Sequence, residues 1–306
     1  MKTGEKLQII KRLSGLTQEQ LAKKLETSFV TLNSWINERS TPHKEAEERI
    51  NVLYKEYTGQ KIIPTNALAA KKEIIRKKSR KAGNILKLIL KRQDLYDSFM
   101  LRLTYNTNSI EGNTLSENET ARILFQNWSI PHKSLTEQME AKNHQAAYKY
   151  LLSYLSGDGK LDDDLILKLH SILMNGIRDD AGFYRGHAVR IVGANLPTAN
   201  YIKMPDLMAE LSATINFKRE DGIRHNAEIH SHFEQIHPFA DGNGRIGRLL
   251  MTAMLLKDNL PPAIIHQGKK QFYYAFLNKA QTLGDTSLLE DFICDAVLEG
   301  FDIPGV

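Results

Sequence analysis

Apolar residues recur at helical spacing along most of the chain, which predicts a mainly α-helical protein. The spacing is clearest on both sides of a polar stretch at residues 237–245. Upstream, Ile229, Phe233 and Ile236 share one helix face. Downstream, the apolar residues at the same spacing are Ile246, Leu249, Leu250, Met254 and Leu255. The polar stretch therefore begins as a short loop that joins two helices.

Capping residues mark several other helices. Ser116 with Glu119 and Ser134 with Glu137 have the spacing of capping boxes, so helices are expected over about residues 116–127 and 134–155. Further helices are expected at residues 161–174, 206–217, 270–283 and 288–300. One segment differs, because residues 187–192 alternate apolar and polar side chains. With a turn at 193–197 and a return strand at 199–204, they predict a β-hairpin.

The first third of the chain predicts a separate small domain. Thr17 with Gln20 is a third capping box, and a following helix would pack Leu32 and Trp35 against the first. We expect a helical domain at residues 1–58, a basic helical connector at 59–92 and a larger domain at 93–306.

Composition excludes some classes of protein. The chain has 306 residues, of which 42% are hydrophobic and 25% charged, as in globular proteins of about two domains. Its one cysteine, Cys294, excludes a disulfide framework. Neither a signal-peptide pattern nor an apolar run of membrane-spanning length is visible. A cytoplasmic protein is therefore expected.

Charge is distributed unevenly along the sequence. Residues 1–92 hold 21 Lys and Arg against 9 Asp and Glu, whereas the remaining residues hold 20 against 27. A basic N-terminal third is typical of nucleic-acid binding, but it also fits helices with solvated basic faces.

The stretch at residues 237–248 combines the groups that phosphate chemistry needs. Gly242, Asn243 and Gly244 allow successive backbone N–H groups to converge at a helix start, where anions bind. Arg245 and Arg248 lie three residues apart on the next helix, so two guanidinium groups indicate more than one phosphate.

Two further side chains add a base and a metal ligand. His237 titrates near neutral pH and can accept a proton from an attacking hydroxyl. Asp241 offers the hard oxygen that Mg²⁺ prefers. A histidine metal site is not favoured, because His230 and His232 are two residues apart on a helix and cannot face one ion. The sequence also lacks the P-loop motif of nucleotide kinases.

Residues 237–248 read His-Pro-Phe-Ala-Asp-Gly-Asn-Gly-Arg-Ile-Gly-Arg, which resembles the Fic-family signature His-Pro-Phe-x-Asp-Gly-Asn-Gly-Arg-x-x-Arg. The resemblance implies an all-α core that transfers AMP from ATP to a Ser, Thr or Tyr hydroxyl of a target protein. By this resemblance, His237 is the general base for the target hydroxyl and Asp241 binds Mg²⁺. The residues assigned to the nucleotide are Gly242, Asn243, Gly244, Arg245, Arg248, Tyr273, Tyr274 and Asn278. The residues alone do not distinguish AMP transfer from phosphoryl transfer.

An upstream segment resembles the inhibitory motif of the same family, Ser/Thr-x-x-x-Glu-Gly/Asn. Thr107 and Glu111 are four residues apart on one helix face, and Gly112 follows. The resemblance implies an inhibitory helix near residues 104–112, in which Glu111 pairs with Arg248 and displaces the γ-phosphate of ATP.

The expected hairpin has a counterpart in the family, a flap that holds the target by main-chain pairing. The flap residues would be Val189, Ile191, Val192 and Gly193. An ordinary surface hairpin is the alternative explanation.

Residues 6–55 resemble a helix-turn-helix of the Cro/C1 class. DNA contacts would come from Gln18, Ser28, Thr31, Asn33 and Ser34. This set lacks the Arg and Lys that usually read bases, so a protein-interaction domain remains an alternative. Two functional alternatives also stay open: a DNA-binding regulator with a silent nucleotide domain, and a transferase that uses another nucleotide donor.

Overall fold

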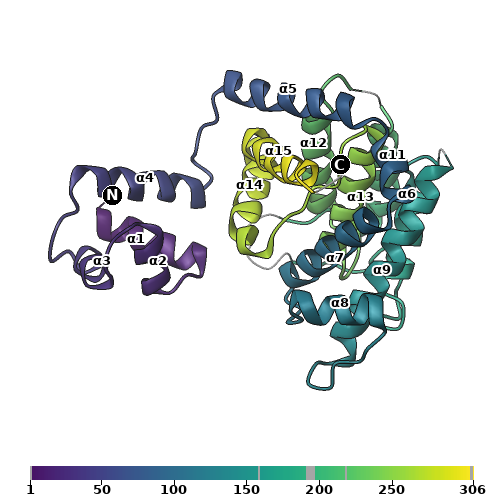
Figure 1. The fold of residues 1–306 in the computed structure, drawn as a ribbon, viewed down its shortest axis with the longest axis horizontal. Coiled ribbons are helices and arrows are strands. Elements are labelled where there is room, and N and C mark those ends of the chain that lie inside the picture. The colour runs from purple at the N-terminus through teal and green to yellow at the C-terminus, as the bar shows by residue number, and fades with distance from the viewer. Residues whose placement is uncertain (1, 158, 191–196, 218, 304–305) are drawn as a thin grey trace.

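A computed structural model describes residues 2–157, 159–190, 197–217, 219–303 and 306. Over these residues the chain forms helices, turns and loops, without a strand, so the expected helical class is confirmed for the described part (Figure 1). None of the described helices is long and apolar enough to cross a membrane.

The N-terminal residues form a small helical unit with its own core (Figure 1). Its helices are α1 (Thr3–Ser14), α2 (Gln18–Lys24), α3 (Phe29–Ile36) and α4 (Lys44–Tyr57). The predicted capping box of Thr17 and Gln20 is present at the start of α2. Leu32 and Trp35 are buried in the unit, as the helical spacing predicted.

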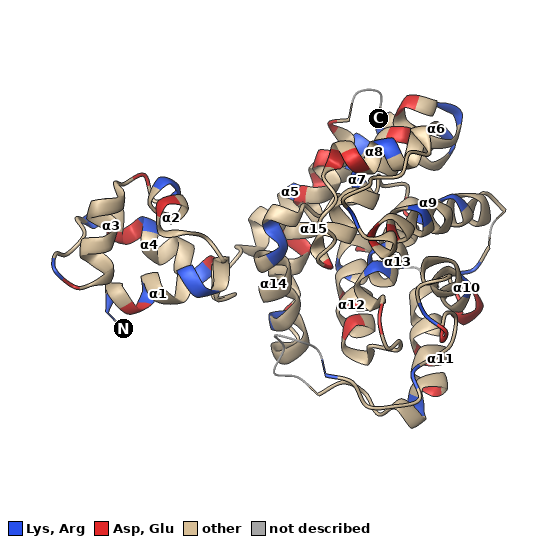
Figure 2. Cartoon of the chain, turned by 90° about the horizontal axis from the view of Figure 1, so that it is seen from below, with Lys and Arg blue, Asp and Glu red and all other residues tan. Residues whose placement is uncertain are grey.

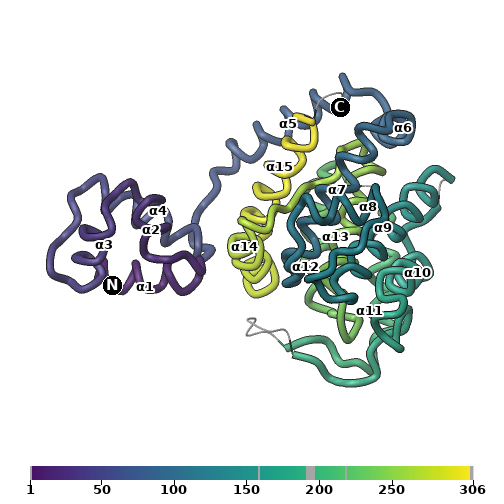
Figure 3. Tube along the Cα trace, turned by 60° about the horizontal axis from the view of Figure 1, so that its bottom comes forward, coloured from purple at the N-terminus to yellow at the C-terminus, as the bar shows by residue number. Residues whose placement is uncertain are grey.

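Residues 59–92, expected as a connector, contribute two helices to the larger unit: α5 (Thr65–Ala82) and α6 (Ile85–Lys91). Ile75, Ile85 and Ile89 are fully buried in the core of that unit. Helix α5 packs along α15 (Ser287–Phe301) near the other end of the chain (Figures 1 and 3).

Three lysines of α5 form ion pairs with acidic residues far away in sequence: Lys71, Lys72 and Lys78. Figure 2 marks the basic and acidic positions along the backbone. Lys71 pairs with Asp291 and Asp295 on α15. The buried Lys72 pairs with Asp221 and with Glu290 of α15. Part of the positive charge of the N-terminal third is therefore neutralised within the chain.

The larger unit packs around α13 (Asn243–Lys257), whose residues are almost all buried. Its neighbours include α7, α9, α10 and α12, which surround it in the tube view (Figure 3). The remaining elements are α7 (Gln93–Ile110), α8 (Glu117–Gln126), α9 (Leu135–Ser156), α10 (Asp163–Leu173), α11 (Met204–Ile215), α12 (Gly222–Ile236) and α14 (Lys270–Leu283), with short 3₁₀ helices η1 (Tyr201–Lys203) and η2 (Gln267–Lys269). The capping boxes predicted for α8 and α9 are both present.

The return strand expected at residues 199–204 is wrong. Tyr201–Lys203 is the 3₁₀ helix η1, which leads directly into α11. Asn200 favours this turn, because its Oδ1 accepts a hydrogen bond of 3.1 Å from the N–H of Ile202. Residues 187–190 are not a strand either. The end of the expected first strand, at residues 191–192, and residues 193–196 of the expected turn at 193–197 lie outside the described residues.

Candidate active site

A cavity of about 550 Å³ opens between the C-terminal ends of α7 and α12, the start of α13 and the face of α14. The residues that line it are Ile110, Glu111, Arg190, Glu234, His237, Gly244, Arg248, Lys270, Gln271, Tyr273, Tyr274, Leu277, Asn278 and Gln281. The structure therefore brings predicted residues from three distant parts of the sequence to one cavity.

His237 ends α12 with φ 54° and ψ 60°, a left-handed conformation that is uncommon outside glycine. Arg185 holds this turn, since its Nε donates to the carbonyl of His237 at 2.8 Å. The Nδ1 of His237 lies 3.3 Å from the carbonyl oxygen of Glu234. When Nδ1 donates this bond, Nε2 is the nitrogen that can accept a proton. Burial lowers the pKa of His237, so the neutral base form is favoured.

The loop after His237 is fixed by side chains beneath it. Asn243 accepts from the N–H of Phe239 at 2.9 Å and donates to its carbonyl at 2.8 Å. The ring of Phe239 stacks on His170 at a centroid distance of 3.7 Å. His170 accepts from the N–H of Gly182 through Nδ1, which leaves Nε2 to donate to the carbonyl of Asp241. Asn243 is thus a support of the loop, and its side chain does not line the cavity.

Gly242 and Gly244 are required in the loop for different reasons, the first for its backbone conformation and the second for lack of space. Gly242 has φ 82°, a conformation that glycine adopts without strain. Gly244 lies in the first turn of α13, and a Cβ there would collide with Oε1 of Glu111. The carboxylate of Glu111 therefore sits against the N-terminal end of α13, where an anion is favoured.

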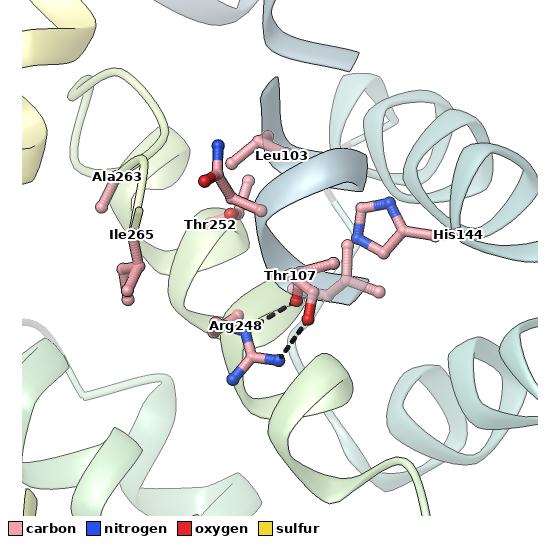
Figure 4. A pocket seen from close by; sticks show the side chains of 9 residues that line it. Leu103, Thr107, His144, Arg248, Thr252, Ala263 and Ile265 are labelled. Atoms are coloured by element: carbon pink, nitrogen blue, oxygen red, sulfur yellow. Dashed lines mark hydrogen bonds between the residues drawn. The ribbon is translucent and has the colours of Figure 1, made fainter. Parts of the chain in front are cut away.

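Arg248 connects the expected inhibitory helix to the cavity. Its Nη2 lies 2.5 Å from Oε1 of Glu111, so the predicted ion pair is present. Its Nε donates to Oγ1 of Thr107 at 2.6 Å, and Nη2 also donates to the Thr107 carbonyl at 3.2 Å. Figure 4 shows Thr107 of α7 facing Arg248 of α13 across these bonds, beside a small cavity of about 20 Å³. Gly112 follows Glu111 with φ 103°.

Arg245 points away from the cavity. Its side chain is 2% exposed, and its Nη1 donates to Oε1 of Glu140 on α9 at 2.8 Å. Its Nη2 lies 3.4 Å from Oδ1 of Asp241. The two arginines that were expected to bind phosphates together therefore diverge, with Arg248 alone lining the cavity. This arrangement makes Arg245 a support for the loop.

Asp241 is the expected metal ligand. Its side chain is 54% exposed, and its Oδ1 accepts from the N–H of Gly242 at 2.6 Å. Among the described residues no group of three or more His, Cys, Asp or Glu could hold a metal ion. One exposed carboxylate fits a Mg²⁺ that takes its other ligands from phosphates and water.

The expected nucleotide residues of α14 separate into a buried and an exposed group. Tyr273 is 1% exposed, and its hydroxyl lies 2.6 Å from Nε2 of His230. Tyr274 is 38% exposed and, like Asn278, lines the cavity. Lys270 at the start of α14 donates to the carbonyl of Ile110, which ties α14 to the end of α7.

Of the expected flap residues, Val189 lies in a described loop, whereas Ile191, Val192 and Gly193 lie outside the described residues. Arg185 links the two arms of this loop, because it donates to the carbonyls of His187 and Ala199 at 2.7 and 2.6 Å. Thr198 Oγ1 donates to the carbonyl of Val189 at 2.8 Å.

The residues proposed for DNA contact lie in the N-terminal unit, on or beside α2 and α3. Ser28 caps α3, because its Oγ accepts from the N–H of Thr31 at 3.1 Å. The Ser34 hydroxyl is 2.8 Å from that of Ser40, and Asn33 accepts from Asn37 at 2.9 Å. Gln18 is the first residue of α2. Several of these polar groups are thus already used within the unit.

The sequence patterns gave no role to Glu234, Arg185 or Glu140, and His230 was considered only as a metal ligand. A signal for Glu234 was available, because it continues the buried stripe of α12 at the spacing of Ile223, Ala227 and His230. For Arg185 and Glu140 no local pattern exists, since their partners lie 52 and 105 residues away.

Comparison with known proteins supports a Fic-type core. Residues 160–255 match the sequence model of the Fic/DOC family. The chain is 34% identical over 184 residues to the protein adenylyltransferase Fic of Nematostella vectensis, which covers 58% of this chain and 42% of that protein. It is 31% identical over 206 residues to the protein of the same name from Aedes aegypti, covering 65% and 40%. The chain thus spans less than half the length of these curated relatives.

Solved structures share the fold. A Fic domain containing signaling protein from Bacteroides thetaiotaomicron has a TM-score of 0.67 at 23% identity, covering 76% of this chain and 95% of that one. Fic-1 from C. elegans has a TM-score of 0.60 at 24% identity, covering 97% and 95%.

Proposed function

We propose that this protein transfers AMP from ATP to a Ser, Thr or Tyr hydroxyl of a target protein. The observation that carries the proposal is the cavity that holds His237, Arg248 and the N-terminal end of α13 together. These supply a base, a guanidinium and an anion-binding helix end, which are the groups that nucleotidyl transfer requires. The curated relatives named protein adenylyltransferase support the choice of AMP.

In this proposal His237 accepts the proton of the target hydroxyl through Nε2. The hydroxyl oxygen then forms a bond to the α-phosphorus, and the bond from that phosphorus to the bridging oxygen of the β-phosphate breaks, so pyrophosphate leaves. Arg248 binds the outer phosphates, and backbone N–H groups at the start of α13 stabilise the charge that develops. Asp241 would hold Mg²⁺, which neutralises phosphate charge when bound.

We further propose that Glu111 inhibits this reaction. Its carboxylate pairs with Arg248 and lies against Gly244 at the start of α13. It therefore competes with the outer phosphates of ATP for the same guanidinium and the same helix end. Thr107 contributes by accepting a bond from Nε of Arg248, which orients the guanidinium toward Glu111.

Other parts of the cavity would bind the remaining groups. Tyr274 and Asn278 line the cavity and are suited to the adenine ring, with the buried Tyr273 beside them on α14. The target segment would pair with the expected flap, of which residues 187–190 are described, and Arg190 lines the cavity.

The experiment that tests the proposal compares two radioactive labels. The Glu111→Gly variant is incubated with Mg²⁺ and with ATP labelled either on the α-phosphate or on the γ-phosphate, and label on protein is measured. AMP transfer predicts incorporation from the α-label alone. Incorporation from the γ-label would indicate phosphoryl transfer, and no incorporation from either would favour another nucleotide donor. Glu117→Gly, at the exposed start of α8, is a control that should leave the wild-type rate unchanged.

A further inference from the structure

Glu234 is a buried carboxyl group in the wall of the cavity that the proposed reaction does not use. The residue is 7% exposed, and it lies one helical turn before His237 on α12. Within the described part of the chain its Oε1 is buried and has no hydrogen-bond partner. An unpaired buried carboxylate is costly, so the charge of Glu234 must depend on the groups around it.

The charged and titratable groups that act on Glu234 come from α12, α13, α14 and the end of α7. On α13, a Cβ at Gly247 would collide with Oε1 of Glu234. The carboxyl group therefore lies against the residue that precedes Arg248. Charges that act on it are those of Arg248 and, from the end of α7, Glu111. Tyr273 and Tyr274 face it from α14. His230, which like Glu234 belongs to α12, also lies against Gly247.

Two carboxyl groups, those of Glu111 and Glu234, thus interact electrostatically with Arg248. Glu111 forms the ion pair, and the Nη1 of Arg248 has no hydrogen-bond partner among the described residues. Burial raises the pKa of Glu234 to about 7, with Arg248 opposing and Glu111 reinforcing the change. An anion bound to Arg248 therefore favours the neutral form of Glu234, and Glu111 is the structure's own example of such an anion.

We propose that Glu234 is a positioning residue for Arg248: it is the anionic counter-ion of the guanidinium when neither Glu111 nor a phosphate is paired with Arg248, and it takes up a proton when phosphates bind. This inference rests on the proposed function, because it concerns the same phosphate site. It predicts that nucleotide binding is coupled to proton uptake at a residue that does not contact the nucleotide's reacting atoms.

The sign of the coupling follows from linkage. If bound phosphates raise the pKa of Glu234, nucleotide affinity is greatest where Glu234 is already protonated and falls as the pH rises. The loss reaches about tenfold for each unit by which binding raises the pKa. Glutamine at this position keeps the shape but cannot ionise, so it should remove this part of the pH dependence.

The test measures binding of the α,β-methylene analogue of ATP, which cannot undergo the proposed cleavage, by calorimetry from about pH 6 to about pH 8.5. The parent is Glu111→Gly, and it is compared with the same protein carrying Glu234→Gln. Glu228→Gln in the same background is the control, because it removes a 44% exposed carboxylate from the same helix. Taking the ratio of dissociation constants, parent over variant, cancels the titration of the analogue and of His237.

The proposal expects this ratio to rise with pH for Glu234→Gln and to stay constant for Glu228→Gln. The parent should also take up more protons on binding than the Glu234→Gln protein, when calorimetry is repeated in buffers of different ionisation enthalpy. A constant ratio with good binding throughout would overturn the role of Glu234 and leave the proposed function intact. Failure of all three proteins to bind the analogue would contradict the nucleotide site itself.

Discussion

At the scale of single residues, His237 carries the most direct chemical expectation. Its conformation is set by α12 and by Arg185, and its Nδ1 faces the carbonyl of Glu234. In the Glu111→Gly background, His237→Ala should lower the rate of transfer by about 10²- to 10⁴-fold, because the general base is lost. Binding of ATP should be nearly unchanged in calorimetry. A variant that still transfers AMP at the parent rate would show that another group is the base.

The pH dependence of transfer should reflect the burial of the same histidine. Burial lowers the pKa of His237, so its neutral form is present below the ordinary value of about 6.5. The rate of the Glu111→Gly protein should therefore stay high to below this pH and decline only in more acidic solution. The measurement is a pH–rate profile at saturating ATP. An acid limb centred at or above about 6.5 would contradict this assignment.

Part of this residue-level picture was predictable from sequence. The chemistry of His237 and the pairing of Glu111 with Arg248 followed from short motifs and a family resemblance, and the ion pair is present. The position of Arg245 did not follow, because two residues three apart on a helix differ by about 60° in direction. That difference is enough to turn Arg245 toward Glu140 on α9.

At the scale of elements, helix ends were predictable where the signal is local. The capping boxes of α2, α8 and α9 involve side chains only three residues apart. The return strand at residues 199–204 was wrong because the pattern of alternating residues was outweighed by the capping of η1 by Asn200. The packing of α5 on the larger unit could not be predicted either, since its acidic partners lie about 150 to 220 residues further along the chain.

The contact between α5 and α15 gives a prediction for stability. Lys72 is buried between Asp221 and Glu290, so Lys72→Ala leaves the buried Glu290 without its cation. The free energy of unfolding should fall by about 3–5 kcal/mol. Lys71→Ala is the matched control on the same helix, with a side chain that is 26% exposed, and should cost about 1 kcal/mol or less. Urea denaturation measures both, and equal losses would contradict the special role of Lys72.

At the scale of the whole molecule, the N-terminal unit rests on the outer face of α14. Tyr57 stacks on Phe272 at a centroid distance of 4.3 Å, and Lys24 lies 5.0 Å from the same ring. Phe272 immediately precedes Tyr273 and Tyr274, which line the cavity. One helix thus contacts the N-terminal unit and the candidate site, an arrangement that no sequence motif indicated.

Removing this contact should loosen the N-terminal unit. Tyr57→Ala deletes the stacked ring, and aromatic pairs contribute about 0.5–1.5 kcal/mol beyond the area they bury. We expect a larger radius of gyration in small-angle X-ray scattering, with helix content by circular dichroism almost unchanged. Tyr54→Ala, on the same helix and partly buried against the core of the N-terminal unit, tests whether any change is specific to the stacked ring. Identical scattering curves for wild type and Tyr57→Ala would contradict the contact.

In the proposed mechanism, Glu111 restrains AMP transfer by holding Arg248, and this restraint is open to a direct test. It is tested most directly by intact-mass spectrometry of the wild-type and Glu111→Gly proteins after incubation with ATP and Mg²⁺, with the Glu111→Gly/His237→Ala protein as control. Additions of the mass of an AMP group are expected on the Glu111→Gly protein or on protein substrates added to it, and few or none with the other two proteins. Equal addition on wild type and Glu111→Gly would contradict inhibition, and addition on the His237→Ala protein would contradict the assigned base.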